Sequence, residues 1–166
     1  MESVHGSKII YMYRPLNAEA KKSAALRLAF VKENGNTVST DADTTQTKDG
    51  TLRSPSQPEI EITSTSVLAV GDKMIDLLKK AQLNNEKVEV WEINLAEPGT
   101  TSGKYKGTYY QAYITESEKS SPSDDWVEMS LTFGIEGKGA EGDVTVPQNM
   151  LDEALYTFTD TTAQAE

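Results

Sequence analysis

The sequence predicts a mainly β protein: an antiparallel β-sandwich or barrel with one flanking α-helix and a long projecting loop. Three observations predict this fold class. Several segments alternate apolar and polar residues at every second position, which is the period of a half-buried strand. One segment, residues 72–83, places apolar residues at helical spacing. A polar stretch at residues 32–57 separates two strand-like segments and is much longer than an ordinary connection.

Two segments show regular strand alternation. Every odd position from 127 to 135 is apolar, whereas residues 128, 130 and 132 are polar or charged. We therefore expect residues 126–135 to form a strand with one face on the core and a wetter opposite face. The even positions from 24 to 30 are also apolar. Residues 24–31 are accordingly expected to form another strand.

Four other segments are expected to be strands. Residues 9–13 are apolar on both faces, residues 59–70 begin with isoleucines that alternate with glutamates, and residues 109–115 are rich in aromatic and β-branched side chains. In residues 88–95 the apolar positions change phase, from 88 and 90 to 91, 93 and 95. That change predicts either a β-bulge or burial on both sides.

The predicted helix spans residues 72–83. Asp72 follows a glycine and is a suitable N-cap, two lysines near the C-terminal end suit the helix dipole, and Asn84 and Asn85 provide a stop. The expected buried stripe consists of Met74, Leu77, Leu78 and Ala81.

Two segments near the C-terminus have no clear period. The glycines at positions 134, 137, 139 and 142 are expected to mark the end of a strand and a flexible turn, because no helix follows them as a dinucleotide fingerprint requires. Residues 1–146 are expected to form one domain, and residues 147–166 a C-terminal arm whose scattered apolar residues dock on a neighbouring subunit.

The charge balance argues against tight binding of nucleic acid. The 166 residues include 26 acidic and 16 basic side chains, for a formal charge of −10. Proteins that grip DNA neutralise phosphates with lysine and arginine, so this chain is better suited to a surface past which DNA slides. It has no cysteine, no signal-peptide pattern and no run of about 18 apolar residues. We expect a soluble protein made in the cytoplasm.

A search for catalytic, metal-binding and cofactor-binding residues yields none. His5 lies at the terminus, far from any expected rigid pocket or orienting partner. Asp41 and Asp43 have the start of a calcium-loop spacing, but the glycine and the final glutamate of that loop are missing. Asp124 and Asp125 are adjacent, so an extended chain would point them in opposite directions, and we expect a turn there.

The strand aromatics support an alternative function. A β-sandwich module that binds carbohydrate or a cell surface would need a platform of aromatic side chains. Core or interface packing is the commoner use of strand aromatics. The candidates for a platform are Trp91, Trp126, Tyr109, Tyr110 and Tyr113.

Five stretches, in their order and spacing, carry a resemblance to a known family. They are residues 26–30, the acidic and threonine-rich loop that ends at 47–50, residues 66–72, residues 88–93, and residues 109–113 followed by 142–145. Over roughly residues 8–146 the chain resembles the major tail tube proteins of long, non-contractile-tailed bacteriophages, the siphophages, of Gram-positive hosts.

The resemblance implies a structural virion protein, made in the host cytoplasm, whose hexameric rings stack into a hollow tube for genome delivery. The implied partners are further copies of the chain, a tape measure protein inside the tube, the tail terminator and distal tail proteins, and double-stranded DNA in transit. It implies neither catalysis, nor a cofactor, nor a membrane. The 32–57 loop would reach an adjacent ring, with Asp41, Asp43, Lys48, Asp49 and Arg53 as its contact candidates. Carboxylate candidates for the lumen wall are Glu59, Glu61, Glu89 and Glu92.

Overall fold

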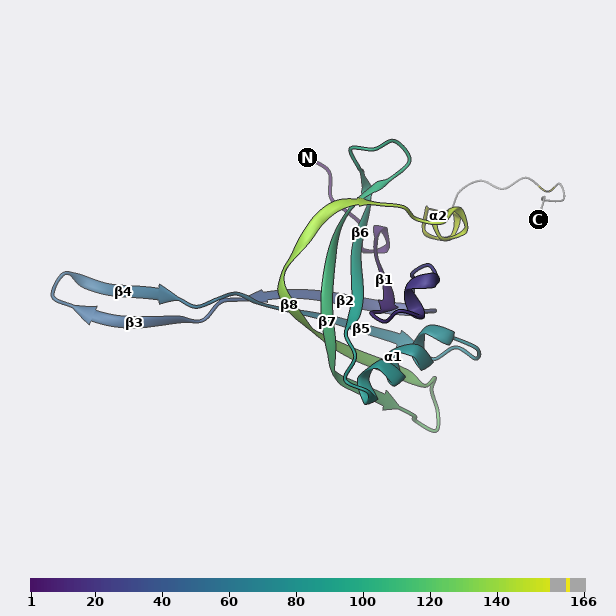
Figure 1. The fold of residues 1–166 in the computed structure, drawn as a ribbon, viewed down its shortest axis with the longest axis horizontal. Helices are drawn as coiled ribbons and strands as arrows, with labels where there is room; N and C mark the ends of the chain where they lie inside the picture. Colours follow the sequence, from purple (N-terminus) through teal and green to yellow (C-terminus); the bar gives the residue numbers. More distant parts are fainter. Residues whose placement is uncertain (156–160, 162–166) are drawn as a thin grey trace.

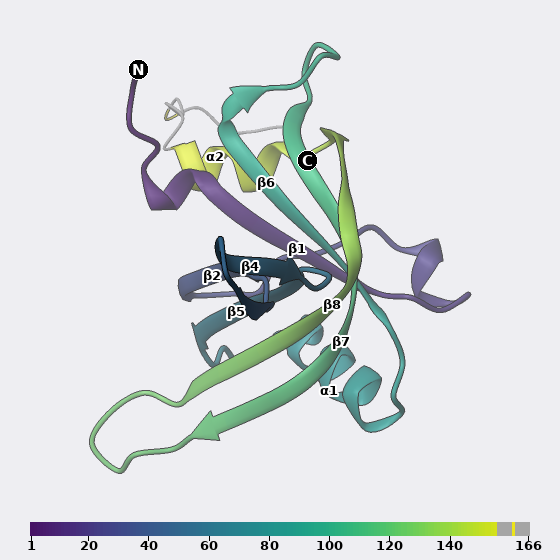
Figure 2. The same cartoon turned by 90° about the vertical axis from the view of Figure 1, so that its left-hand side faces the viewer.

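The computed structural model describes residues 1–155 and 161. Its body is a six-stranded antiparallel sheet with strand order β1-β6-β7-β8-β5-β2 (Figures 1 and 2). A separate two-stranded ribbon, β3-β4, projects from it. The sheet strands are β1 (Ile9–Pro15), β2 (Val31–Ser39), β5 (Glu59–Val67), β6 (Val88–Pro98), β7 (Tyr105–Ser120) and β8 (Glu128–Val144). The ribbon strands are β3 (Ala42–Thr47) and β4 (Gly50–Pro55), and the helical elements are η1 (Gly6–Lys8), η2 (Ala20–Lys22), α1 (Lys73–Leu83) and α2 (Gln148–Leu155). The mainly β prediction is confirmed.

The sheet curls around its own core. β1 and β8 are three positions apart in the strand order, so in a flat sheet they would lie about 14 Å apart. Yet the rings of Tyr13 on β1 and Phe133 on β8 stack with their centroids 5.0 Å apart. Such a contact requires the sheet to bend until strands from its two halves face each other, which is the sandwich or barrel geometry expected.

Two hydrophobic clusters lie on opposite faces of the sheet. The larger one fills the concave face and receives α1 at one end. The smaller one lies on the other face of β1 and β6, beneath α2. On β6, Val88 and Val90 belong to the first cluster, whereas Ile93 and Leu95 belong to the second. The phase change in residues 88–95 therefore reflects burial on both sides, since the register of β6 with β7 shifts only beyond Asn94.

Asp72 fixes the start of α1 as predicted. One of its carboxylate oxygens accepts from the amide of Met74 at 3.1 Å, and the other accepts from the amide of Ala29 at 3.0 Å. The stop is also confirmed, because Asn85 takes a left-handed φ of 53°. The predicted stripe is wrong at Leu77, which is 40 % exposed. The side chains that α1 buries are Met74, Ile75, Leu78 and Ala81.

Residues 24–31 do not form the predicted strand. In place of a strand ladder they form one isolated antiparallel bridge, between Leu26 and Tyr13 of β1. Leu28 is fully buried, but Phe30 has a φ of 47° and is 68 % exposed. The alternating apolar residues therefore do not share a face, because the chain turns at Phe30 to enter β2.

The glycine-rich segment is strand and not the predicted turn. β8 continues through it to Val144 and stays paired with β7. Gly137 and Gly139 have φ values of 75° and 77° and lie in a bulge, residues 137–139, between the pairs Gln111–Glu136 and Tyr109–Ala140 of the β7–β8 ladder. A Cβ at position 139 would lie 2.6 Å from the ring of Tyr110.

The predicted C-terminal arm begins with a helix that packs on its own subunit. Met150 and Leu151 of α2 are buried in the smaller cluster, together with Val146. The body and the start of residues 147–166 thus share one core. The rest of the predicted arm, residues 156–160 and 162–166, lies outside the described residues. Among the residues that are described, no helix is long and apolar enough to cross a membrane.

Candidate functional site

The projecting ribbon is the first candidate surface, and residues 40–58 are called the arm below. β2 and β5 pair up to Ser39 and Glu59, and the pairing resumes in the ribbon at Ala42 and Pro55. At the joint, the amide and the hydroxyl of Ser56 donate to the carbonyl of Asp41 at 2.7 and 2.9 Å. The predicted loop bounds of 32–57 are wrong at the start, because residues 32–39 belong to β2 of the main sheet. The part that projects is a hairpin that continues the line of β2 and β5 (Figure 1).

The arm packs on no other part of the described chain. Every residue from 36 to 59 is exposed, including Val38 at 63 % and Leu52 at 61 %. Threonine-rich strands favour extended backbone, but a two-stranded ribbon with two open faces is marginally stable in water. Such a segment gains stability when another surface covers one of its faces.

The five predicted contact residues are spread along the arm. Arg53 pairs with Thr44 on one face, and Asp43 shares the other face with Leu52. Lys48 and Asp49 form the tip, where the hydroxyl of Thr47 donates to the carbonyl of Gly50 at 2.6 Å. Asp41 lies at the joint. Within the described residues, none of these five charged side chains has an ion-pair partner.

The outer face of the sheet is the second candidate surface. Ile62, Ser64 and Ser66 of β5 are buried toward the core, so the alternate positions point outward. Glu59 and Glu61 are among those outward positions and are exposed. Opposite Glu61 lie Thr37 on one side and Gly134 on the other. This part of the sheet therefore presents small polar groups and free carboxylates.

Glu89 does not contribute a free carboxylate in the protomer. It is 5 % exposed, forms an ion pair with the Nε of Arg14 at 2.7 Å and accepts from the hydroxyl of Tyr109 at 2.9 Å. Burial, with the bond to Glu89, raises the pKa of Tyr109. The guanidinium of Arg14 also lies 5.2 Å from the ring centroid of Trp91. The prediction that Glu89 belongs with the lumen carboxylates is not supported by this geometry.

Glu92 is half-buried on the concave side of the sheet. Its carboxylate accepts from the hydroxyl of Tyr11 and from the side-chain amide Nδ2 of Asn36, the latter at 2.8 Å. Burial raises the pKa of Tyr11 well above its usual value, and the bond to Glu92 adds to that rise. Glu92 thus ties β1 and β2 together across the mouth of the barrel. Of the four lumen candidates, Glu59 and Glu61 are left as exposed charges.

Replacing Glu89 by alanine is expected to lower the free energy of unfolding by about 3 kcal/mol, because a partly buried guanidinium and a tyrosine hydroxyl lose their acceptor. Urea unfolding followed by tryptophan fluorescence measures this change. The matched control is Glu61→Ala on the exposed face, expected to stay within about 0.5 kcal/mol of wild type. Equal effects at the two positions would contradict the structural role of Glu89.

Asp143 holds the loop between β6 and β7. Its carboxylate accepts from the hydroxyl of Thr100 at 2.7 Å and from the amides of Thr100 and Thr101 at 3.0 and 2.7 Å. These bonds, led by that of the Thr100 hydroxyl, lower the pKa of Asp143 to about 2. Stability from a carboxylate with a lowered pKa is present above its unfolded value and is lost as pH falls through its folded value.

The amide NMR signals of Thr100 and Thr101 are therefore expected to titrate with a midpoint near pH 2, below the ordinary carboxyl value of 3.8. At neutral pH, Asp143→Ala is expected to speed hydrogen exchange of these two amides on the order of tenfold, while exchange in the β7–β8 ladder stays unchanged. A midpoint at the ordinary value would show that the carboxylate does not hold the loop.

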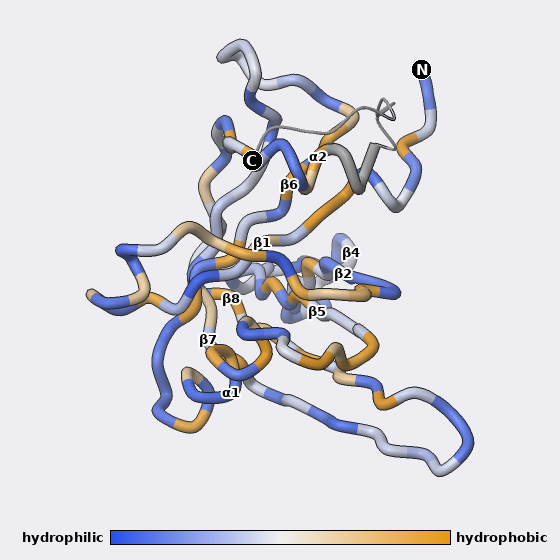
Figure 3. The backbone as a smooth tube through the Cα atoms, turned by 90° about the vertical axis from the view of Figure 1, so that its right-hand side faces the viewer, coloured by the Kyte–Doolittle hydropathy of each residue, from blue (hydrophilic) through white to orange (hydrophobic). Residues whose placement is uncertain are grey.

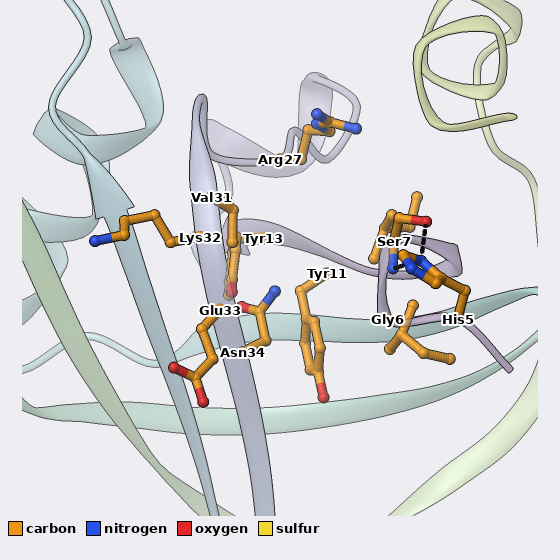
Figure 4. Close-up of a pocket in the computed structure, with 12 residues that line it drawn as sticks. His5, Gly6, Ser7, Tyr11, Tyr13, Arg27, Val31, Lys32, Glu33 and Asn34 are labelled. Atoms are coloured by element: carbon orange, nitrogen blue, oxygen red, sulfur yellow. Dashed lines mark hydrogen bonds between the residues drawn. The ribbon is translucent and has the colours of Figure 1, made fainter. Parts of the chain in front are cut away.

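A groove of about 840 Å³ separates the two edge strands, β1 and β2 (Figure 4). Its wall contains Tyr11 and Tyr13, whose pKa values burial raises far above neutrality, so neither phenol serves as a base. His5, at the rim, is exposed as expected. Its Nδ1 accepts from the amide of Ser7 at 3.3 Å and lies 2.8 Å from the Ser7 hydroxyl. That local bond caps η1.

Titratable side chains do not cluster in a metal-binding arrangement in the part of the chain that the structure describes. Asp41 and Asp43, tested above against the calcium-loop spacing, lie in the exposed joint and in β3. Asp124 and Asp125 lie in the turn before β8, as predicted, and Asp125 accepts from the amide of Trp126 at 2.7 Å.

The aromatic residues considered for a sugar platform do not form one surface. Tyr110 is buried in the core, whereas Tyr109 packs on Trp91 on the other face of the sheet, with ring centroids 5.4 Å apart. Tyr113 is 37 % exposed and lies 5.8 Å from the Lys87 ammonium. Trp126 is 75 % exposed but lies in the loop before β8.

Comparisons with known proteins agree with these features. Residues 3–140 match the family model described as phage tail tube protein. A protein of Staphylococcus phage phiMR25 described as a tail protein is 26 % identical over 147 residues, covering 86 % of this chain and 76 % of the relative.

Three solved structures share the fold. The SPP1 tail tube gives a TM-score of 0.76 at 18 % identity, over 99 % of this chain and 91 % of that one. The tail of an empty gene transfer agent particle, with C6 symmetry, gives 0.60 at 10 % identity, over 83 % and 98 %. The sheath–tube complex of the extracellular contractile injection system PVC gives 0.54 at 16 % identity, over 86 % and 93 %.

Proposed function

Because the chain belongs to the phage tail tube protein family, we propose that it assembles into hexameric rings that stack into a hollow tube for delivery of the phage genome. The single observation that carries the stacking is the arm, a long ribbon with two open faces and no support from the described part of its own subunit. The number six follows the C6 symmetry of the gene transfer agent tail, whose subunit has the same fold.

We assign the arm to contacts between rings. A subunit that must bind copies above and below itself needs a segment that reaches beyond its own body, and a hairpin in line with β2 and β5 provides that reach. The charged side chains available for this contact are Asp41, Asp43, Lys48, Asp49 and Arg53.

The lumen wall is assigned to the outer face of the sheet with Glu59 and Glu61. Six copies of a chain with a formal charge of −10 give a ring a charge near −60. Carboxylates and small polar side chains repel phosphate and offer it no cation to grip, so DNA passes without sticking. The proposed location is the virion tail, after synthesis in the host cytoplasm.

The remaining partners follow from the same role. A tape measure protein would fill the lumen before DNA passes, and terminator and distal tail proteins would cap the two ends. The protein is proposed to have no catalytic activity and no cofactor. The five candidate aromatic residues do not share one surface that would support the alternative of a carbohydrate-binding module, and a glycan-binding screen of wild type and Trp126→Ala tests it directly.

The test of tube formation is electron microscopy. Purified protein, concentrated stepwise and viewed in negative stain, is expected to form rings and then tubes. A protein that stays monomeric at every concentration, also in the presence of the tail-initiation proteins of its phage, would overturn the proposal.

A further inference from the structure

Three exposed apolar residues belong to segments that adjoin one another at one end of the sheet. Phe30 is 68 % exposed, Trp126 is 75 % exposed and Val70 is fully exposed. The chain segments that carry them are joined by backbone hydrogen bonds: Val67 donates to the carbonyl of Phe30 at 3.0 Å, and Leu68 to that of Val127 at 2.8 Å. Phe30, Val70 and Trp126 are called the apolar patch below.

The apolar patch and the arm lie at opposite ends of the same two strands. β2 begins next to Phe30 and ends at the base of the arm, and β5 runs back from the arm toward Val70. Nine residues of strand separate the two ends by about 30 Å. Figure 1 shows the arm pointing away on the left, while the ends of β5 and β7 lie on the right, the side that faces the viewer in Figure 3.

We propose that the apolar patch is the docking site for the arm of a second copy of this chain, in the next ring. The inference rests on the proposed tube function and adds the receiving surface. Both sides of this contact are exposed apolar groups: Leu52 on the arm and Val38 on β2 just before it, and the patch at the far end of the body. Covering both removes apolar area from water and supports the open ribbon.

Opposite charges are available near the two surfaces, and the arm also carries Asp41, Asp43 and Asp49. Lys48 at the tip and Arg53 on β4 have no ion-pair partner within the described residues. Asp124 and Asp125 precede Trp126 in the exposed turn beside the patch and are likewise without an ion pair there. A docked arm would bring the two cations near these two carboxylates, and the charges would orient the contact.

Because the arm and the apolar patch lie at opposite ends of the subunit, their contact produces a polymer that can grow without closing on itself. An arm at one end and its receptor at the other make a heterologous contact, which repeats without closing when copies stack along the strand direction. One end of every stack would then present free arms, and the other end free apolar patches. The two ends of the tube would accordingly need different capping proteins.

The experiment uses engineered cysteines, because the chain has none of its own. The variant Leu52→Cys/Val70→Cys is assembled and mildly oxidised, then run on a non-reducing gel. We expect a ladder of covalent oligomers, because each subunit links to the copies above and below it. Either single variant is expected to remain monomeric. The control Leu52→Cys/Ser102→Cys, with its second cysteine in the β6–β7 loop away from both ends, is expected to give no ladder.

A second measurement uses the exposed patch itself. Phe30→Ser/Trp126→Ser is expected to raise the concentration needed for tube formation about tenfold or more, while the monomer keeps the circular dichroism of wild type. Tubes from the cysteine variants without a ladder, or a ladder equal to that of the control, would overturn the docking site and leave the tube function standing. Absence of tubes from wild type as well would overturn the tube function and this inference together.

Discussion

A variant in which Asn-Gly replaces residues 40–58 is expected to fold as a stable monomer and to form no tubes. The change joins Ser39 to Glu59, which already pair, through a two-residue turn suited to a hairpin. The deleted residues are all exposed and bury nothing in either core, so the stability of the body should hardly change. Circular dichroism and urea unfolding check the fold, and negative-stain microscopy checks assembly.

The boundaries of this variant depend on the structure. A deletion of residues 36–53 would cut into the sheet, because residues 36–39 belong to β2 and pair with β5. Asn36 also donates to Glu92. A matched control is Ser54→Ala, which keeps the full arm and is expected to form tubes like wild type. Tubes of normal length from the armless variant would refute the role of the arm between rings.

Replacing Phe133 by alanine is expected to destabilise the protomer by about 3–5 kcal/mol. Phe133 is fully buried and stacks on Tyr13, so it joins the two halves of the curled sheet. Removing the ring leaves a cavity at the point where β8 faces β1. For a chain of this size the loss lowers the melting temperature by about 10 °C.

Urea unfolding measures the change, with an unaltered slope indicating that the folded body is otherwise intact. The matched control is Thr132→Ala, one residue earlier, which points to the opposite face and is expected to stay within about 0.5 kcal/mol of wild type. Similar losses at positions 132 and 133 would contradict the assignment of the concave face. Tube formation by Phe133→Ala at low temperature would separate stability from assembly.

Where an element has one buried and one wet face, sequence periodicity predicted it correctly. The alternation in residues 127–135 became β8, and the capped helical stripe became α1, because each pattern reports a face that packs on the core. Leu77 was misassigned because α1 packs on the sheet along a line closer to Ile75. Apolar residues at helical spacing predict an amphipathic helix. They do not fix which of the side chains at the border of the apolar face is buried against the sheet.

Alternation failed where no partner strand was present. Residues 24–31 have the right pattern, yet they find a single bridge to Tyr13 and turn at Phe30. The reverse occurred in the glycine-rich segment, where β7 pairs with β8 on both sides of a bulge at residues 137–139 and holds residues of low strand propensity extended. Strand formation depends on a pairing strand that is distant in sequence, and local composition does not show whether such a strand is present.

The candidate surfaces were likewise predictable from the sequence only in part. The sequence located the long polar hairpin and the acidic candidates, because length, threonine content and charge are properties of the chain itself. Which carboxylates are free was not predictable: Glu61 stays in water, whereas Glu89 lies against Arg14 and Tyr109 from two other strands. The apolar patch was missed because its three residues are separated by up to about 100 positions and meet only through β5.

The sequence by itself determined the fold class, the single capped helix of its central part, the projecting arm and the acidic balance, since these follow from local periodicity and composition. The tertiary structure decided which strands pair, which charges are neutralised by burial, and that the arm and the apolar patch occupy opposite ends of one strand pair. Those properties arise from contacts between residues distant along the chain. The curl of one sheet around Tyr13 and Phe133 is what brings such residues together.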